Sequence, residues 1–156
     1  MNDETVSPTR LSEVSPEVEH LLIRALVAEL SVIAGGGRVV SYPLIPLFDG
    51  EKIYMTSSVL FSKKLEHIKA NPKVAVSISD PSAVSGTELA GATIQGEAAA
   101  IDDDLHEGWM RLLPLWRQKE PSVDVFLKKR FAMPLFWERA IIEITPKRVF
   151  VWRRES

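Results

Sequence analysis

Two turn signals separate three β-type runs in the first third of the chain, and they constrain the fold more than any other feature. Three consecutive glycines at 35–37 divide a run at 30–34 from one at 38–48, and an Asp-Gly pair at 49–50 precedes a third run at 52–56. Turns this short join antiparallel neighbours, because parallel strands need a crossover of a dozen residues or more. A glycine cluster that cradles phosphate would open a helix, whereas strand-like Val-Val-Ser-Tyr-Pro follows here. The sequence therefore predicts antiparallel hairpins.

Further β-type runs continue this pattern along the chain. They lie at 74–79, 92–101, 140–145 and 148–152. The last two are expected to form a closing hairpin across Pro146-Lys147. Pro43 and Pro46 have no amide hydrogen to donate, so we expect the strand that contains them to be bent or to lie at a sheet edge. Six or more antiparallel strands in one domain indicate a barrel, a mainly β fold with peripheral helices.

The sequence contains fewer helical patterns than β-type runs. Ser15 is a favoured N-cap and Pro16 a favoured first helical residue, which together predict an amphipathic helix of about four turns. Its apolar positions are Leu21, Leu22, Ala25, Leu26 and Leu30. Shorter helices are expected at 62–70, 105–117 and 121–130. Residues 1–14 are polar and show no periodicity, so they predict a flexible arm, and residues 15–156 predict a single domain.

The composition limits the classes of function. Lys and Arg number 19 and Asp and Glu 21, a net charge of −2 that argues against nucleic acid as the main partner. No apolar run approaches the ~18–20 residues that cross a bilayer, and the first residues lack a secretory signal, so no membrane partner is expected. The absence of cysteine excludes disulfides and thiolate chemistry, and it fits the cytoplasm, which we expect as the compartment.

Metal binding and hydrolysis are not expected either. His20, His67 and His106 lie far apart, and none has the second ligand that a zinc motif places at helical spacing. The aspartates at 102–104 could attract Ca²⁺ or Mg²⁺, but carboxylates in the first turn of a helix more often accept its free backbone N–H groups. No Gly-x-Ser-x-Gly elbow marks a nucleophile.

The stretch at 56–64 joins hydroxyl groups to two adjacent lysines. If Ser62 caps the following helix, these lysines add positive charge to the positive end of the helix dipole, which is unfavourable. A bound phosphate would relieve that conflict by accepting hydrogen bonds from the hydroxyl and ammonium groups. A solvated loop explains the same residues, and physical chemistry alone leaves both interpretations open. The candidate phosphate donors are Arg38, Thr56, Ser57, Ser62, Lys63 and Lys64.

The same stretch resembles a known family. IYMTSSVLFSKKLEHIKANPKVAVSI is similar to the signature of the pyridoxamine 5'-phosphate oxidase-like, flavin-binding split-barrel proteins, in which a strand ending in Thr or Ser leads to Ser-Lys/Arg-Lys and a short helix. GGGRVVSYPLIPLFDGEKIYMTSS is similar to the hairpin that precedes this strand in the family. ATIQGEAAAIDDD and IIEITPKRVFVW resemble its later strands, so the resemblance runs from about residue 18 to 152.

The resemblance implies a six-stranded antiparallel split barrel that forms a homodimer, with FMN bound at each of two interface sites. It implies that Thr56 and Ser57 bond the ribityl phosphate and that Ser62, Lys63 and Lys64 hold the phosphate. Trp152, and more weakly Trp137, would cover the site from the partner subunit. A third implied group runs beside the isoalloxazine ring: Arg38, Val39, Val40, Ser41, Tyr42 and Pro43.

Two departures shape the expected function. The loop SSVLF is longer than in the oxidases proper, and VFVWRRES lacks the Arg and His that grip pyridoxal phosphate, so vitamin B6 oxidation is not expected. The segment LKKRFAMPLFWERAIIEI is similar to members that use the deazaflavin coenzyme F-420. The leading hypothesis is an FMN-dependent oxidoreductase acting on a small molecule. The alternatives are an F-420-dependent reductase of the same fold and a flavin- or haem-binding module without turnover.

Overall fold

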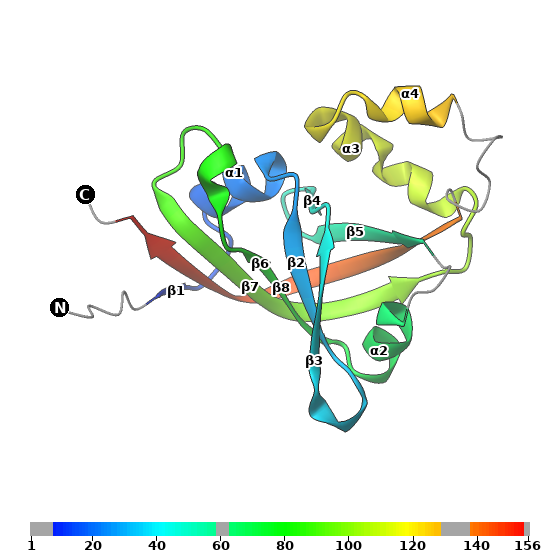
Figure 1. Cartoon of the computed structure of the whole chain (residues 1–156), viewed down its shortest axis with the longest axis horizontal. Helices are drawn as coiled ribbons and strands as arrows, with labels where there is room; N and C mark the ends of the chain where they lie inside the picture. Colours follow the sequence, from blue (N-terminus) through cyan, green and yellow to red (C-terminus); the bar gives the residue numbers. More distant parts are fainter. Residues whose placement is uncertain (1–7, 59–62, 129–137, 155–156) are drawn as a thin grey trace.

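The computed structural model describes residues 8–58, 63–128 and 138–154, and its strands form one antiparallel sheet. Neighbouring strands follow the order β3-β2-β6-β7-β8-β5-β4, and β1 pairs with β8 outside this path (Figure 1). The strands are β1 (Thr9–Leu11), β2 (Ala28–Ile33), β3 (Val39–Leu44), β4 (Leu47–Phe48), β5 (Ile53–Ser58), β6 (Lys73–Ile78), β7 (Leu89–Ile101) and β8 (Arg139–Arg153). The helices are α1 (Pro16–Arg24), α2 (Lys64–Ala70), α3 (Leu113–Lys119) and α4 (Val123–Leu127), with 3₁₀ turns η1 (Gly35–Gly37), η2 (Pro81–Ala83) and η3 (Gly108–Leu112).

The sheet curls into the split barrel that the sequence predicts. Apolar residues alternate along its strands, as in β2, where Ala28, Leu30 and Val32 are fully buried and face one core with α1. The described part of the sheet has eight strands instead of six. One added strand is β1, which lies within the segment expected to be an arm. The other is β4, because the run at 38–48 is interrupted after β3.

Both predicted turns are confirmed. The glycines of η1 join β2 to β3, and Gly36 and Gly37 have φ angles of 77° and 82°, which other residues rarely adopt. At the second turn, Asp49 Oδ1 accepts from the amides of Glu51 and Lys52 over 2.9 and 2.7 Å. The edge position predicted from Pro43 is also correct, since β3 pairs only with β2 in the sheet path.

The predicted closing hairpin is wrong, because β8 runs without a turn from Arg139 to Arg153. It pairs with β7 along most of its length. Pro146 is accommodated by a shift of register, in which Gly96 faces Pro146 while Gln95 faces Arg148. Lys147 is therefore the extra residue of a β-bulge, one of the few places where a sheet tolerates proline. A Pro-Lys pair in a β-rich sequence does not by itself distinguish a turn from such a bulge.

The first helix is shorter than predicted. It begins at Pro16 with Ser15 as N-cap, as expected, but it ends at Arg24 after nine residues. Leu30, which continues the helical spacing, belongs instead to β2 and pairs with both β3 and β6. Pairing on two sides outweighs a weak helical preference, because each strand neighbour supplies backbone hydrogen bonds and buried contacts.

A second, smaller core lies on the other side of β5, beneath η3, α3 and α4. It contains Leu47, Tyr54, Trp109, Leu112, Leu113, Val123 and Ile141. Asp104 opens this helical region and accepts from the amides of His106 and Glu107 over 3.1 and 2.9 Å, the helix-start role expected for the acidic cluster. Among the described residues, no helix is long and apolar enough to cross a membrane.

Candidate functional site

The end of β5 buries two hydroxyl groups. This strand lies between the main core and the smaller core, so its residues are covered on both faces. Thr56 is 7% exposed and Ser57 is 1% exposed, and they are the two buried polar side chains of the described chain. Buried hydroxyls need hydrogen-bond partners, because an unsatisfied one costs about 1–3 kcal/mol. Each hydroxyl accepts from a cation, and Ser57 Oγ also donates to the carbonyl oxygen of Ser58 over 3.0 Å.

Lys64, the first residue of α2, supplies one of these cations. Its Nζ donates to Ser57 Oγ over 3.2 Å and lies 4.8 Å from the centroid of the Tyr42 ring. Burial lowers the pKa of Lys64, and the nearby positive charge of Arg139 lowers it further. The ammonium group is thus held by a hydroxyl and an aromatic face in a half-buried position.

Arg139, the first residue of β8, supplies the second cation. Its Nε donates to Thr56 Oγ1 over 2.8 Å, and one terminal nitrogen lies 3.4 Å from the carbonyl oxygen of Thr56. The guanidinium also stacks against Trp116 of α3, 5.8 Å from the ring centroid. Burial lowers the pKa of Arg139 to about 10, so the group remains charged at neutral pH.

We call this group of contacts the Lys64–Arg139 cluster: Tyr42, Thr56, Ser57, Lys64, Trp116 and Arg139. Burial lowers the pKa of Lys64 most, and repulsion from the positive charge of Arg139 lowers it further. A phosphate group would offset this repulsion. A phosphate monoester carries about −1.5 to −2 charges near neutral pH, which matches the two cations. The donor types and their charge are therefore compatible with a phosphate group.

A further donor lies beside Arg139. The indole Nε1 of Trp116 is buried and has no hydrogen-bond partner within the part of the chain that the structure describes. Buried polar atoms without a partner are uncommon in folded proteins. This indole N–H adds to the donors near the cluster.

The structure brings only some of the sequence-predicted residues into the cluster. Thr56, Ser57, Lys64 and Tyr42 belong to it, and Val40 packs inward against the main core on the same strand as Tyr42. Lys63 is exposed and occupies the N-cap position of α2, which begins at Lys64 and not one residue earlier. Ser62 and Trp137 lie outside the described residues. The exposed members of the predicted group are Arg38, Val39, Ser41 and Pro43.

Trp152 lies near the opposite end of β8 from Arg139. Along an extended strand this separation is about 40 Å, so Trp152 does not join the cluster of its own chain. Its side chain lines a hollow of about 400 Å³ together with residues of β6 and β7.

Arg139 is not among the site residues predicted from the sequence. Its position carries no local signal beyond standing at the start of a predicted strand. Its contact with Thr56 follows from the pairing of β5 with β8, in which Thr56 faces Ile141 and Ser58 faces Arg139. Strand partners far apart in the chain are fixed by tertiary structure, and the sequence offers no rule that identifies them.

Comparison with known proteins gives a family match over nearly the whole chain. A family model described as pyridoxamine 5'-phosphate oxidase matches residues 16–153. None of the curated proteins matches this sequence.

Similar solved structures include a protein named F420 reductase, with 22% identity and a TM-score of 0.59 over 84% of this chain and 94% of that one. A FAD-binding protein from Mesorhizobium loti has 18% identity and a TM-score of 0.60 over 96% of this chain and 99% of that one. The haem storage protein HutZ from Vibrio cholerae has 14% identity and a TM-score of 0.63 over 90% and 95%. At these identities the likeness shows a shared fold.

Proposed function

Because the chain belongs to the pyridoxamine 5'-phosphate oxidase family, we propose that it binds FMN and acts as an oxidoreductase on a small molecule. The observation that carries this proposal is the Lys64–Arg139 cluster, in which two cations from different elements converge on the buried hydroxyls at the end of β5. Vitamin B6 oxidation is not part of the proposal, because the Arg and His that grip pyridoxal phosphate in the oxidases have no counterpart in the C-terminal segment.

In this proposal Lys64 and Arg139 hold the flavin phosphate, and Thr56 and Ser57 orient both cations and the ribityl chain. Arg139 keeps its charge at neutral pH, with its pKa near 10. Residues 38–43 run beside the ring. The flavin itself would carry the hydride. The protein would bind and orient the cofactor and exclude water, and it needs no catalytic dyad.

The test begins with the protein as purified. We expect a yellow protein with flavin absorbance, and FMN in the mass spectrum of the material released on denaturation. The variant Lys63→Ala/Lys64→Ala should lose this chromophore, because it removes a cation from the phosphate site. A protein that stays colourless and fails to bind FMN at micromolar concentration in a titration overturns the proposal.

A matched control separates the site from general charge effects. Lys69→Ala/Lys128→Ala also removes two positive charges, but Lys69 pairs with Asp102 at the surface and Lys128 is exposed on α4's C-terminal side. We expect this control to bind FMN as the wild type does. An equal loss of FMN in both double variants would show that net charge, and not the cluster, governs binding.

We further propose that the protein is a cytoplasmic homodimer with cofactor sites at the interface. The placement of Trp152 supports a second subunit, because within one chain it is too far from the cluster to cover a cofactor there. Sedimentation or light scattering should give twice the mass of one chain. A strictly monomeric protein that still binds FMN tightly would remove the role proposed for Trp152.

The deazaflavin coenzyme F-420 is the second candidate, favoured by the likeness to the protein named F420 reductase. Calorimetric titration with FMN and with F-420 decides between them, and a clear preference for F-420 would replace FMN in the proposal. A non-catalytic binder is distinguished by kinetics. The reduction of the bound flavin by NAD(P)H and by reduced F-420 is measured in the presence of a panel of small-molecule acceptors. A flavin that neither donor reduces would indicate storage or sensing.

A further inference from the structure

The β-bulge in β8 places two adjacent cations on the same face of the sheet. In a regular strand consecutive side chains point to opposite faces. Here Lys147 is the extra residue, so Lys147 and Arg148 are both exposed on the outer face before Val149 returns to the core. Bulges frequently re-aim side chains next to functional sites.

Glycine at position 96 makes this arrangement compatible with the neighbouring strand. Gly96 faces Pro146 across the bulge, and a Cβ atom at this position would lie 2.3 Å from the carbonyl oxygen of Thr145. Any side chain would therefore push β7 and β8 apart at the bulge. The close approach of the two backbones thus depends on Gly96 in β7 and on the bulge at Lys147 in β8.

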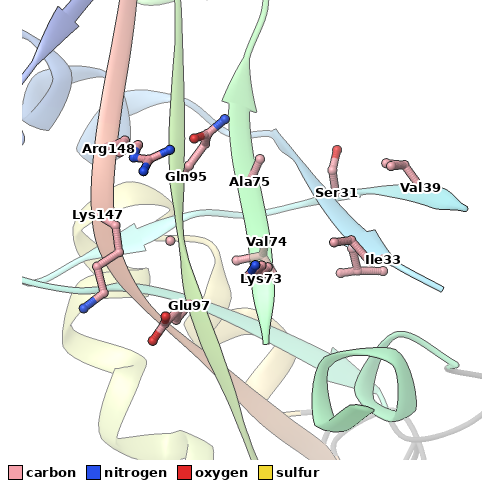
Figure 2. Close-up of a pocket in the computed structure, with 12 residues that line it drawn as sticks. Ser31, Ile33, Val39, Lys73, Val74, Ala75, Gln95, Glu97, Lys147 and Arg148 are labelled. Atoms are coloured by element: carbon pink, nitrogen blue, oxygen red, sulfur yellow. The ribbon is translucent and has the colours of Figure 1, made fainter. Parts of the chain in front are cut away.

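These cations border a hollow of about 540 Å³ on the outer face of the sheet (Figure 2). Lys147 and Arg148 lie on its β8 side (Figure 2). Ile33 of β2 and Val39 of the edge strand β3 lie on the opposite side (Figure 2). The side chain of Gln95 lies beside Arg148 between them. The hollow thus has an apolar end and a cationic end.

The charge around the hollow is positive. Lys73, Lys147 and Arg148 line it together with one carboxylate, that of Glu97. Among the described residues, none of these three cations takes part in an ion pair within 4.0 Å. Val39, at the apolar end, is 63% exposed although it is aliphatic. An anion with an apolar body would satisfy both ends at once.

We propose that this hollow binds a small planar molecule with an aromatic or aliphatic body and a carboxylate or other anionic group. The body lies on Ile33, Val39 and the floor of β6, and the anionic group faces Lys147 and Arg148. Gln95 supplies an amide between the two ends. The volume suits a small molecule, since ligand pockets typically measure about 300–1,000 Å³.

One step of this inference rests on the proposed function. The hollow includes Val39 of β3, and Tyr42 of the Lys64–Arg139 cluster belongs to the same strand. The flavin ring is proposed to run beside residues 38–43. Val39 is exposed on the outer face and Tyr42 packs against the core, so their side chains point to opposite faces of β3. A ring that runs along the free edge of β3 would lie between the two, and with that placement the anionic compound is the redox substrate class. The binding site itself does not depend on the cofactor.

The test uses 1-naphthoate as the probe and the full-length, flavin-free protein. In ¹H–¹⁵N spectra we expect the amide shifts to concentrate on Ala75, Gln95 and Lys147 during titration. The uncharged analogue 1-naphthalenemethanol should bind at least tenfold more weakly, and Lys147→Gln/Arg148→Gln should weaken naphthoate binding at least tenfold. Glu97→Gln should strengthen it two- to fivefold, because it removes the one carboxylate found among the described residues that line the hollow.

The control variant Arg24→Gln/Lys128→Gln removes the same charge from α1 and the end of α4 and should bind naphthoate as the wild type does. The proposal is overturned if the double bulge variant binds naphthoate unchanged, if the shifts fall elsewhere, or if a second copy of the chain blocks the probe as protein concentration rises. FMN content is measured in parallel. A double bulge variant that still binds added FMN but has lost naphthoate binding supports the hollow. A wild-type protein that binds naphthoate but does not bind added FMN overturns only the cofactor proposal.

Discussion

Arg139 donates a hydrogen bond from Nε to Thr56 Oγ1 over 2.8 Å, although 83 residues separate the two in the sequence. This contact joins the first residue of β8 to the hydroxyl end of β5 and places a guanidinium beside the ammonium group of Lys64. Lys64, on a short helix, therefore has a second cation as its neighbour. Because α2 has only seven residues, the side chains, and not the helix dipole, carry the proposed phosphate site.

Replacing Arg139 should weaken FMN binding. We expect Arg139→Gln to lower FMN affinity about 10- to 100-fold, since a charge-assisted hydrogen bond contributes about 1.5–3 kcal/mol. The FMN affinity of Arg139→Lys should lie between those of the wild type and Arg139→Gln, because lysine keeps the charge but loses the planar contact with Trp116 and Thr56. Flavin fluorescence quenching measures both. As a control, Arg111→Gln removes an arginine that stacks on Tyr54 and is not a member of the cluster, and this variant should bind FMN normally. Wild-type affinity in Arg139→Gln would exclude Arg139 from the site.

The phosphate should account for most of the affinity for the cofactor. We expect riboflavin, which has the same ring but no phosphate, to bind at least 100-fold more weakly than FMN. The difference should shrink as salt rises, because ions screen the cations of the cluster. Titrating both ligands at low and at high salt provides the measurement. Similar affinities for the two flavins would mean that the ring, and not the Lys64–Arg139 cluster, dominates binding.

Gly96→Ala should destabilise the fold. The added Cβ would lie 2.3 Å from the carbonyl oxygen of Thr145, far inside van der Waals contact, and backbone on both strands would have to move. We expect a loss of about 1–3 kcal/mol in the free energy of unfolding, the usual cost of overpacking. Gly35→Ala is the control, since nothing lies within 4 Å of its Cβ position and its φ is not positive. Urea denaturation that places both variants at the same midpoint contradicts the close approach at the bulge.

Lys119 should make stability depend on pH. Its Nζ donates to the carbonyl oxygens of Leu22, over 2.8 Å, and of Pro46, and burial lowers its pKa to about 7. The unfolded chain, with an ordinary lysine pKa near 10.4, then binds more protons than the folded chain above pH 7, so stability rises with pH in that window.

The comparison variant is Lys119→Met, which has no titrating group at this position. Between pH 7 and pH 9 the wild type should gain about 1–2 kcal/mol in unfolding free energy relative to Lys119→Met, an amount reduced by the partial exposure of the ammonium group. Urea denaturation at pH 6, 7.5 and 9 tests this. Parallel pH profiles for the two proteins would show that Lys119 titrates normally in the folded state.

Much of the fold follows from local patterns in the sequence. The glycines at 35–37, the Asp-Gly turn and the alternation in β6 each predict their structure, because turn conformations and strand periodicity depend on neighbouring residues. Errors occur where two local signals compete. Helical spacing extends to Leu30, but strand pairing ends α1 at Arg24, and Pro146 indicates a turn although it lies in a bulge.

The sequence by itself determined the antiparallel hairpins, the hydroxyl-bearing end of β5 and the lysine that follows it, because these features lie within one segment of chain. Only the tertiary structure decided that Arg139 completes the cluster and that Lys147 and Arg148 share a face of the sheet. Both depend on which strand pairs with β8 and in which register. Register is set by the packing of side chains distant in the sequence, so one shifted residue in β8 changes the charge of an entire surface.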